Sequence, residues 1–221
     1  MKPVSIDGVF EKNGRLFTQN PKCCKGTKVY SEKLITYKNK EFRSWTPYRS
    51  KLAAAILNGL KDINITSDSQ ILYLGAATGT TVSHISDIAK DGTVYAVERS
   101  PVAVKKLLQL SKKRQNIMPI LSDANHPDRY SAIVSTVNIV YQDISQRNQS
   151  EIFIRNVMRY LKKDGQGIIM VKARSIDISM KPKQVYKLVT EDLEEHGLNI
   201  IDLIDISRYE KDHAAIVIQL D

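Results

Sequence analysis

A glycine-rich turn and two acidic residues follow successive apolar runs at the spacing of a nucleoside site. The segment GAATGTT, Gly75 to Thr81, comes directly after an apolar run and opens a helical pattern. Glu98 ends the next apolar run, and Asp123 follows the one after that. Because ligands of doubly wound sheets bind beyond the carboxyl ends of the strands, we expect these groups to line one cleft.

The residue order in the turn indicates which nucleoside it could bind. A dinucleotide site needs G-x-G-x-x-G and a triphosphate site needs G-x-x-x-x-G-K-[ST], and GAATGTT fits neither pattern. Free N–H groups at the start of the following helix suit a nucleoside that carries a carboxylate and no phosphate, such as S-adenosylmethionine. Glu98 would accept the ribose hydroxyls and Asp123 the adenine amino group. Either residue alone would pass for an ordinary polar strand end, so the prediction rests on all three features in succession.

The next two strand ends carry residues suited to the acceptor side of a methyl transfer. Asp143 and Gln146 follow the fourth run, and Lys172 ends the fifth. The Asn/Asp-Pro-Pro-aromatic turn that amino-group methyltransferases commonly carry at this point is absent. A hydroxyl acceptor must lose its proton, and Lys172 beside Asp143 is the candidate base. Lys51 is the candidate second cation and His213 the candidate fourth member.

Each of these assignments has a plainer alternative. A lysine at the end of a buried strand often only reaches for solvent, and a lone histidine in a turn is more often structural. Burial and a nearby cation would lower the pKa of Lys172, whereas Asp143 would raise it. The sequence therefore leaves the protonation state of Lys172 open.

The rest of the chain predicts the sheet that positions these groups. Helical-period segments near 80–89, 101–114 and 148–163 separate apolar runs at 70–76, 93–98, 116–122, 137–142 and 166–173. Strand and helix in alternation predict a parallel sheet. The two final apolar runs have no helix between them, so the last strand should return antiparallel. We expect an α/β fold: a Rossmann-like S-adenosylmethionine-dependent methyltransferase with a mostly parallel sheet of seven strands.

A small antiparallel β domain is predicted for residues 1–46, and the methyltransferase domain for residues 47–221. Asn13-Gly14 favours a tight hairpin turn, and a second hairpin is expected around Lys38 to Lys40. A helix is predicted to follow, with Thr46 as its N-cap and Pro47 at its first position.

Charge is concentrated at the front of this 221-residue chain, whose formal net charge is +9. Residues 1 to 50 carry 11 Lys or Arg against 4 Asp or Glu, whereas the rest carries 22 against 20. The excess suits a polyanion or an acidic partner, and a solvated basic face is the equal alternative.

The adjacent Cys23 and Cys24 form no zinc motif, so we expect reduced thiols and no metal. No export signal or membrane-length apolar run is present, so a cytoplasmic protein without membrane association is expected.

Several motifs, occurring in order from about residue 28 to the end, resemble the fibrillarin family. They are KVYSEKL, FRSWTPYRSKLAAAIL, YLGAATGTTVSHISDI, VYAVERSP, NIMPILSDAN, QDISQRNQ and VKARSID. The resemblance implies a catalytic set that falls by motif on Lys51, Asp143, Lys172 and His213. The cofactor-binding residues predicted from the turn and from the resemblance together are Gly75, Ala77, Thr80, Thr81, Glu98, Arg99, Asp123, Ala124, Asp143, Ile144, Ser145 and Gln146.

The resemblance also implies a function that composition cannot supply. Fibrillarin methylates ribose 2′-hydroxyls of ribosomal and transfer RNA within box C/D guide-RNA particles, docked on a Nop-type scaffold protein that assembles with a kink-turn-binding protein. A methyltransferase for another acceptor, such as protein glutamine, and a non-catalytic subunit of the particle are the alternatives. The glycine-arginine-rich extension of eukaryotic members is absent, which favours an archaeal member. Asn138, Arg99 and Ser31 depart from common family residues, and the cofactor role of Arg99 is the least secure.

Overall fold

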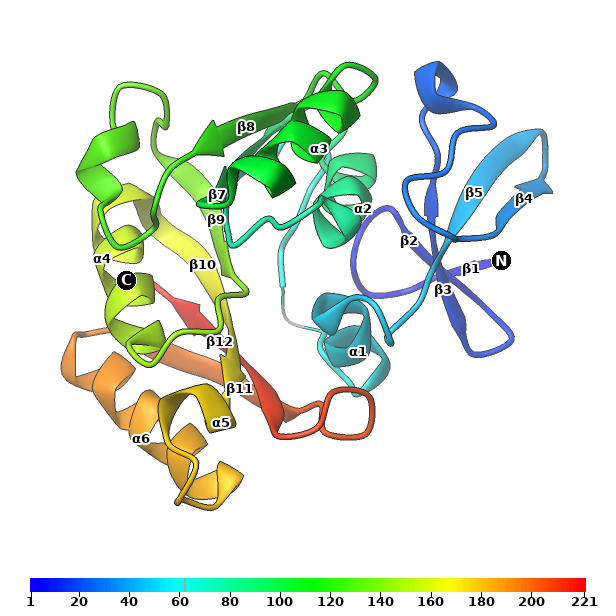
Figure 1. Ribbon diagram of the computed structural model, residues 1–221. Helices are drawn as coiled ribbons and strands as arrows, with labels where there is room; N and C mark the ends of the chain where they lie inside the picture. Colours follow the sequence, from blue (N-terminus) through cyan, green and yellow to red (C-terminus); the bar gives the residue numbers. More distant parts are fainter. Residues whose placement is uncertain (62) are drawn as a thin grey trace.

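Figure 1 shows a computed structural model that describes residues 1–61 and 63–221. The elements are, in chain order, β1 (Lys2–Pro3), β2 (Val9–Lys12), β3 (Arg15–Gln19), the 3-10 helix η1 (Lys22–Cys24), β4 (Leu34–Tyr37), β5 (Lys40–Trp45), α1 (Lys51–Leu57), β6 (Gln70–Leu74), α2 (Thr80–Ile88), β7 (Thr93–Glu98), α3 (Pro101–Ser111), β8 (Ile117–Leu121), the 3-10 helix η2 (Pro127–Tyr130), β9 (Val137–Gln142), α4 (Gln149–Tyr160), β10 (Leu161–Lys172), α5 (Ala173–Ile176), α6 (Pro182–Glu195), β11 (Asn199–Asp205) and β12 (His213–Gln219).

The larger sheet confirms the predicted fold class. Within the described residues it has seven strands in the order β11-β12-β10-β9-β6-β7-β8. Neighbouring strands are parallel except for β12, which is antiparallel to both β10 and β11. The first strand, β6, lies between β9 and β7, so the winding reverses there and the carboxyl ends of these strands open a cleft.

Two helical predictions need correction, and one helix was missed. The first helix begins at Lys51 rather than Pro47, because Ser50 adopts an extended conformation and its hydroxyl accepts the N–H of Ala53 as the N-cap. The fourth helix ends at Tyr160, and the chain passes straight into β10 instead of continuing to residue 163. Helix α6 was not predicted at all, although it begins with Pro182 at its first position.

The N-terminal sheet is antiparallel, as expected, with the strand order β1-β2-β3-β5-β4 in the described residues. Asn13 and Gly14 have φ values of 51° and 72°, and Lys38 and Asn39 have φ values of 47° and 60°. Both central residues of each turn are therefore left-handed, which is the geometry whose twist matches a two-stranded hairpin. Both predicted hairpins are formed.

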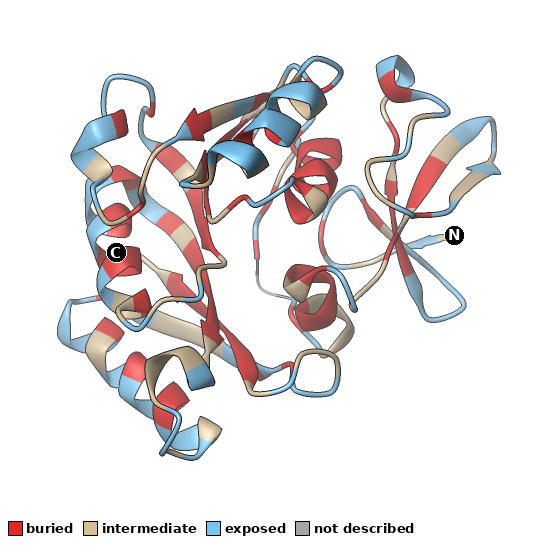
Figure 2. Cartoon of the chain, in the orientation of Figure 1, coloured by how far each residue is buried: buried red, intermediate tan, exposed pale blue. Residues whose placement is uncertain are grey.

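Helix α2 lies between the two sheets and joins them into one body (Figure 1). All its residues from Thr81 to Ile88 are buried, and Figure 2 shows this helix coloured almost wholly as buried. Its apolar residues Val82 and Ile85 belong to one core cluster that also contains Leu16 and Trp45 of the N-terminal sheet. The small sheet is thus packed onto the helix that follows the cofactor turn.

A buried ionic network ties the same helix to its neighbours. Asp87, near the end of α2, forms two ion pairs. Its carboxylate oxygens lie 2.7 Å from the guanidinium of Arg43 in β5 and 3.1 Å from that of Arg114, which follows α3. Arg43 also binds Glu32 at 2.9 Å, and the side chains of all four residues are at most 1% exposed. Removal of one partner from such a cluster leaves a buried charge uncompensated, which typically costs about 3–5 kcal/mol.

His84 of α2 is enclosed by the same network. Its Nδ1 lies 2.7 Å from Thr18 Oγ1, and its Nε2 lies 2.6 Å from the Tyr30 hydroxyl. The Thr18 hydroxyl donates its own hydrogen to Asp87, so Nδ1 carries the hydrogen of this ring and donates to Thr18. Burial and the two neighbouring guanidinium groups lower the pKa of His84 well below its ordinary 6.5. The ring is therefore neutral in the folded protein.

No helix in the described part of the chain is long and apolar enough to cross a membrane.

The neutral His84 makes stability depend on pH. In the unfolded chain this ring binds a proton below pH 6.5, whereas the folded state does not bind it until its lowered pKa is reached. The stabilising contribution is therefore present above pH 6.5 and is lost as the pH falls. We expect the free energy of unfolding, measured by urea titration, to decrease from pH 7 to pH 5.5.

The variant His84→Gln should show a smaller slope of unfolding free energy against pH. The decrease should correspond to at most about one proton bound on unfolding. The same substitution at His196, whose side chain is 52% exposed, controls for the loss of a histidine. Equal slopes for the wild type and His84→Gln would contradict the assignment.

Candidate active site

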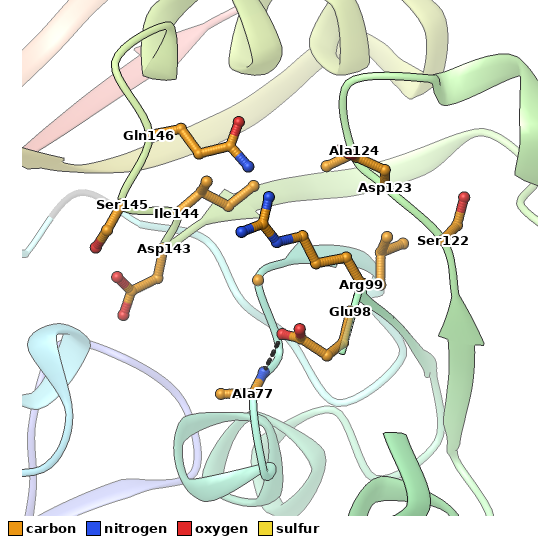
Figure 3. Close-up of a pocket in the computed structure, with 12 residues that line it drawn as sticks. Ala77, Glu98, Arg99, Ser122, Asp123, Ala124, Asp143, Ile144, Ser145 and Gln146 are labelled. Carbon is orange, nitrogen blue, oxygen red and sulfur yellow. Dashed lines mark hydrogen bonds between the residues drawn. The ribbon is translucent and has the colours of Figure 1, made fainter. Parts of the chain in front are cut away.

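A cavity of about 250 Å³ lies at the carboxyl ends of β6, β7, β8 and β9. Ten of the twelve predicted cofactor residues line it, and Figure 3 shows most of them around the opening: Gly75, Ala77, Glu98, Arg99, Asp123, Ala124, Asp143, Ile144, Ser145 and Gln146. Thr80 and Thr81 are not among its lining residues. The strand ends therefore meet as the alternating sequence pattern predicted.

The turn after β6 is shaped by its first glycine. Gly75 has φ +82°, and a Cβ atom at this position would overlap the backbone carbonyl of Asp143. The N–H groups of Gly75 and Ala76 both bond to the carbonyl of Val97 at the end of β7. Only a residue without a side chain fits this approach, so the turn is pressed against both neighbouring strands.

Glu98 is held by the turn that it faces. Its Oε2 accepts the N–H of Ala77 at 2.9 Å, drawn in Figure 3, and its Oε1 accepts the N–H of Ser100 at 2.8 Å. An ionised carboxylate offers about four acceptor positions, so each oxygen keeps one for a ligand. The geometry suits a pair of vicinal hydroxyls.

Asp123 is fixed in the same way from the neighbouring strand. Its Oδ1 accepts both the N–H and the side-chain amide of Asn125, each at 2.9 Å. These bonds, with the backbone one first, lower the pKa of Asp123, so its carboxylate stays ionised. The Asn125 amide also reaches Gln146 Oε1 at 3.1 Å and so links the third and fourth strand ends.

The charged side chains that line the cavity indicate which class of ligand it fits. Three carboxylates line it, from Glu98, Asp123 and Asp143, against the one guanidinium of Arg99. Lys51 matches the charge of Asp143, which still leaves the two carboxylates of Glu98 and Asp123 against Arg99. This excess disfavours a phosphate and favours a phosphate-free nucleoside that carries a cationic sulfonium. In Figure 3 the side chain of Arg99 extends toward Ile144 and Gln146. The donor set therefore fits S-adenosylmethionine.

Lys51 and Asp143 are brought together although 92 positions separate them in the sequence. Lys51 Nζ lies 2.9 Å and 3.1 Å from the two carboxylate oxygens of Asp143, with both side chains about four-fifths buried. Lys51 is the first residue of α1, and Ser50, its N-cap, accepts a hydrogen bond from Thr81 of α2 at 3.0 Å. Asp143 also lines the cavity, so the pair stands at its border.

Lys172 lies at the predicted strand end but does not pair with Asp143. We expected it to contact Asp143, but Lys172 forms no ion pair with any described residue, and Lys51 is the partner of Asp143. The register explains this, because Ile169 pairs with Gln142 and Lys172 stands two residues beyond the level of Asp143. The buried Gln149 accepts the N–H of Lys172 and donates to its carbonyl, which fixes this strand end.

His213 is the antiparallel partner of Lys172 and lies in the same group. Its Nδ1 is 2.8 Å from the carbonyl of Lys211, so Nδ1 donates and Nε2 remains as an acceptor. Burial lowers the pKa of His213, nearby Lys51 acts in the same direction, and the bond to Lys211 opposes both. A neutral imidazole thus stands beside the lysine and carboxylate groups.

The structure adds residues that the sequence pattern did not indicate. Val97 and Ser122 line the cavity one position before Glu98 and Asp123, so the strand ends that predicted the acids also contained them. Ser50 and Gln149 position catalytic candidates through contacts distant in sequence, and no periodic signal announces such contacts. In the described ranges 1–61 and 63–221, no three His, Cys, Asp or Glu side chains are grouped as metal ligands.

Comparison with known proteins places this geometry in a family. The fibrillarin family model matches residues 2–221. The fibrillarin-like rRNA/tRNA 2′-O-methyltransferase of Methanothermobacter thermautotrophicus is 47% identical over 216 residues, which cover 98% of this chain and 96% of that protein.

Two solved structures are similar in sequence and fold. Aeropyrum pernix fibrillarin, in complex with natively bound S-adenosyl-L-methionine, is 40% identical to this chain with a TM-score of 0.85. The match covers 92% of this chain and 88% of the Aeropyrum chain. A fibrillarin/Nop5p complex contains a chain 41% identical with a TM-score of 0.88, covering 98% of this chain and 99% of that one. The chain therefore belongs to the fibrillarin family.

Proposed function

We propose that this protein transfers a methyl group from S-adenosylmethionine to ribose 2′-hydroxyls of ribosomal and transfer RNA, directed by a box C/D guide RNA. The position of Asp143 carries the proposal, because this carboxylate both lines the nucleoside cavity and binds Lys51. One side chain thus joins the donor site to the acceptor site. The name of the Methanothermobacter relative and the cofactor bound to the Aeropyrum protein support the same reaction.

The residues that would hold the cofactor are those fixed at the strand ends. Glu98 would accept the ribose hydroxyls, and Asp123 the adenine amino group, with the oxygen positions that their backbone partners leave open. When bound, S-adenosylmethionine supplies an electrophilic methyl group. Thr80 and Thr81 remain proposed contacts to its amino-acid end, although they lie outside the cavity lining.

The acceptor side must orient a hydroxyl and remove its proton. Lys51 fixes the direction of the Asp143 carboxylate, which can accept a hydrogen bond from the 2′-hydroxyl. Lys172, in its neutral form, would take the proton at Nζ. The neutral His213 beside it offers Nε2 as a further acceptor and adds no positive charge.

We also propose the partners that this reaction needs. The similar chain in the fibrillarin/Nop5p complex supports a scaffold protein of the Nop type. A kink-turn-binding protein and the guide RNA would complete the particle, and base pairing to the guide would then select the nucleotide. A cytoplasmic location is proposed with them.

Substitution of Lys172 tests its role in chemistry rather than in binding. We expect Lys172→Ala to lower the rate of methyl transfer by about 100-fold or more, as is usual for loss of a proton acceptor. The dissociation constant for S-adenosylmethionine, measured by calorimetry, should stay within about twofold. Lys163→Ala, at the exposed start of the same strand, is the control. Loss of cofactor binding in a folded Lys172→Ala protein would show that Lys172 has another role.

Substitution of Glu98 tests the cofactor site directly. Glu98→Ala removes hydrogen bonds from a charged group, each worth about 1.5–3 kcal/mol, so the dissociation constant for S-adenosylmethionine should rise roughly 10- to 100-fold. Glu194→Ala, at an exposed position of α6, is the matched control. An unchanged dissociation constant for Glu98→Ala would contradict the proposed contact of Glu98 with the ribose.

A modified target RNA tests the acceptor atom. The protein is assembled with a Nop-type scaffold, the kink-turn-binding protein and a guide, and supplied with labelled S-adenosylmethionine. An all-ribose target should be methylated at the guided nucleotide, and a target with one 2′-deoxy nucleotide at that position should take no label. Label that appears in protein glutamine, or equally in both RNAs, would reject the proposed acceptor.

A further inference from the structure

A second cavity, of about 550 Å³, lies beside the start of α1, the helix that carries Lys51. It is formed by the segment Thr27–Tyr30, by Arg49 just before α1, by the start of α2 and by the outer face of α3. Its described lining contains no carboxylate and five cationic side chains, those of Lys28, Arg49, Lys106, Lys113 and Arg114.

Four of these cations are exposed and have no counter-ion. Lys28, Arg49, Lys106 and Lys113 form no ion pair within 4.0 Å of a carboxylate in the part of the chain that the structure describes. Lys113 Nζ donates to the Thr27 hydroxyl at 3.1 Å, and the Arg49 guanidinium stands 5.6 Å from the centre of the Tyr30 ring. Neither contact cancels a positive charge.

The fifth cation lies beneath the others. Arg114 is 2% exposed and belongs to the buried network, where Arg43 and Arg114 face Asp87 and Glu32. Two guanidinium groups are thus matched by two carboxylates, which leaves nothing to offset the exposed cations above. Arg114 NH1 has no hydrogen-bond partner among the described residues. The cavity therefore presents a concentrated positive field with hydrogen-bond donors.

The two cavities have linings of opposite charge, and both include residues close in sequence to the catalytic pair or its partners. Arg49 precedes Lys51 by two residues, so their Cα atoms are at most about 7.6 Å apart. Ala77 lines the acidic cavity, and Thr78 and Thr80, in the same turn and helix start, line the basic one. A ribose placed at Lys51 and Asp143 would thus lie close to residues of both cavities.

We propose that the basic cavity binds backbone phosphates of the target RNA strand next to the nucleotide that is methylated, an inference that rests on the proposed function. Cations without acceptor groups suit phosphate oxygens, which are the same at every nucleotide. The contact therefore positions the strand and reads no sequence. It fixes where the sugar lies along the strand while the guide decides which sugar it is.

A pair of charge-matched variants tests the phosphate site. Lys28→Ala with Lys106→Ala removes two exposed, unpaired cations from the cavity. Lys163→Ala with Lys183→Ala removes two exposed, unpaired cations from β10 and α6, away from it. Both double variants lose the same net charge, so any difference between them reports position.

Binding of target RNA to the assembled particle is measured against salt concentration. For the cavity variant we expect the dissociation constant to rise roughly tenfold and the slope of log K against log salt to shrink by about one to two, since each phosphate contact contributes about 0.7–0.9. The control variant should resemble the wild type.

Neutral methylphosphonate linkages identify the contact in the RNA itself. Placed one at a time beside the guided nucleotide, one such linkage should weaken binding to the wild type by about fivefold and leave binding to the cavity variant unchanged. Equal weakening in both proteins, or in neither, would overturn the proposal.

The remaining outcomes distinguish failure of the phosphate site from failure of the proposed methyltransferase function. If the wild type fails to methylate RNA in the full particle, the proposed function is wrong. If it methylates normally and the cavity variant binds RNA as the control does, only the phosphate site is wrong. If the cavity variant loses binding to the scaffold without RNA, the cavity is a protein-docking surface and the proposal falls. Lys106→Ala alone replaces the double variant if circular dichroism shows misfolding.

Discussion

One buried carboxylate, that of Asp87, holds the molecule in its working shape. Arg43 reaches it from the N-terminal sheet, Arg114 from the loop after α3, and Thr18 adds a hydroxyl at 2.8 Å. Because Asp87 is on α2, these bonds fix the helix that begins at the cofactor turn. The small sheet therefore supports the methyltransferase domain by fixing the position of this helix.

The site itself depends on a separation of charge. Carboxylates line the cavity proposed for a cationic donor, and unpaired lysines and arginines line the neighbouring cavity proposed for RNA. Asp143 of the Lys51–Asp143 ion pair lines the first cavity, and Arg49, two residues before Lys51, lines the second. The basic excess of the first 50 residues falls only partly on this face, since Lys28 and Arg49 line the cavity whereas Lys106 and Lys113 come from α3 and the residues just after it.

Sequence reasoning succeeded where local pattern decides position. Strand ends recur with the alternation of apolar runs, so the amino-acid sequence alone was enough to place Glu98, Asp123 and Asp143 on one edge of the sheet. It failed where a contact depends on three-dimensional register, as in the expected partnership of Lys172 with Asp143. It also overlooked α6, whose apolar residues recur at helical spacing on a largely polar segment. The roles assigned to the side chains stay predictions, since geometry places groups and only measurement shows what they do.

The contact of Gly75 with the Asp143 carbonyl has a mechanical consequence. The turn after β6 and the backbone of Asp143 are in close contact, with no space for a side chain at Gly75. The donor turn and the backbone that carries the acceptor carboxylate are therefore coupled, so that a shift of one displaces the other. Whatever alignment an incoming strand lacks must be corrected by the strand itself or by the proteins that carry it, which gives the surrounding assembly the task of fine adjustment.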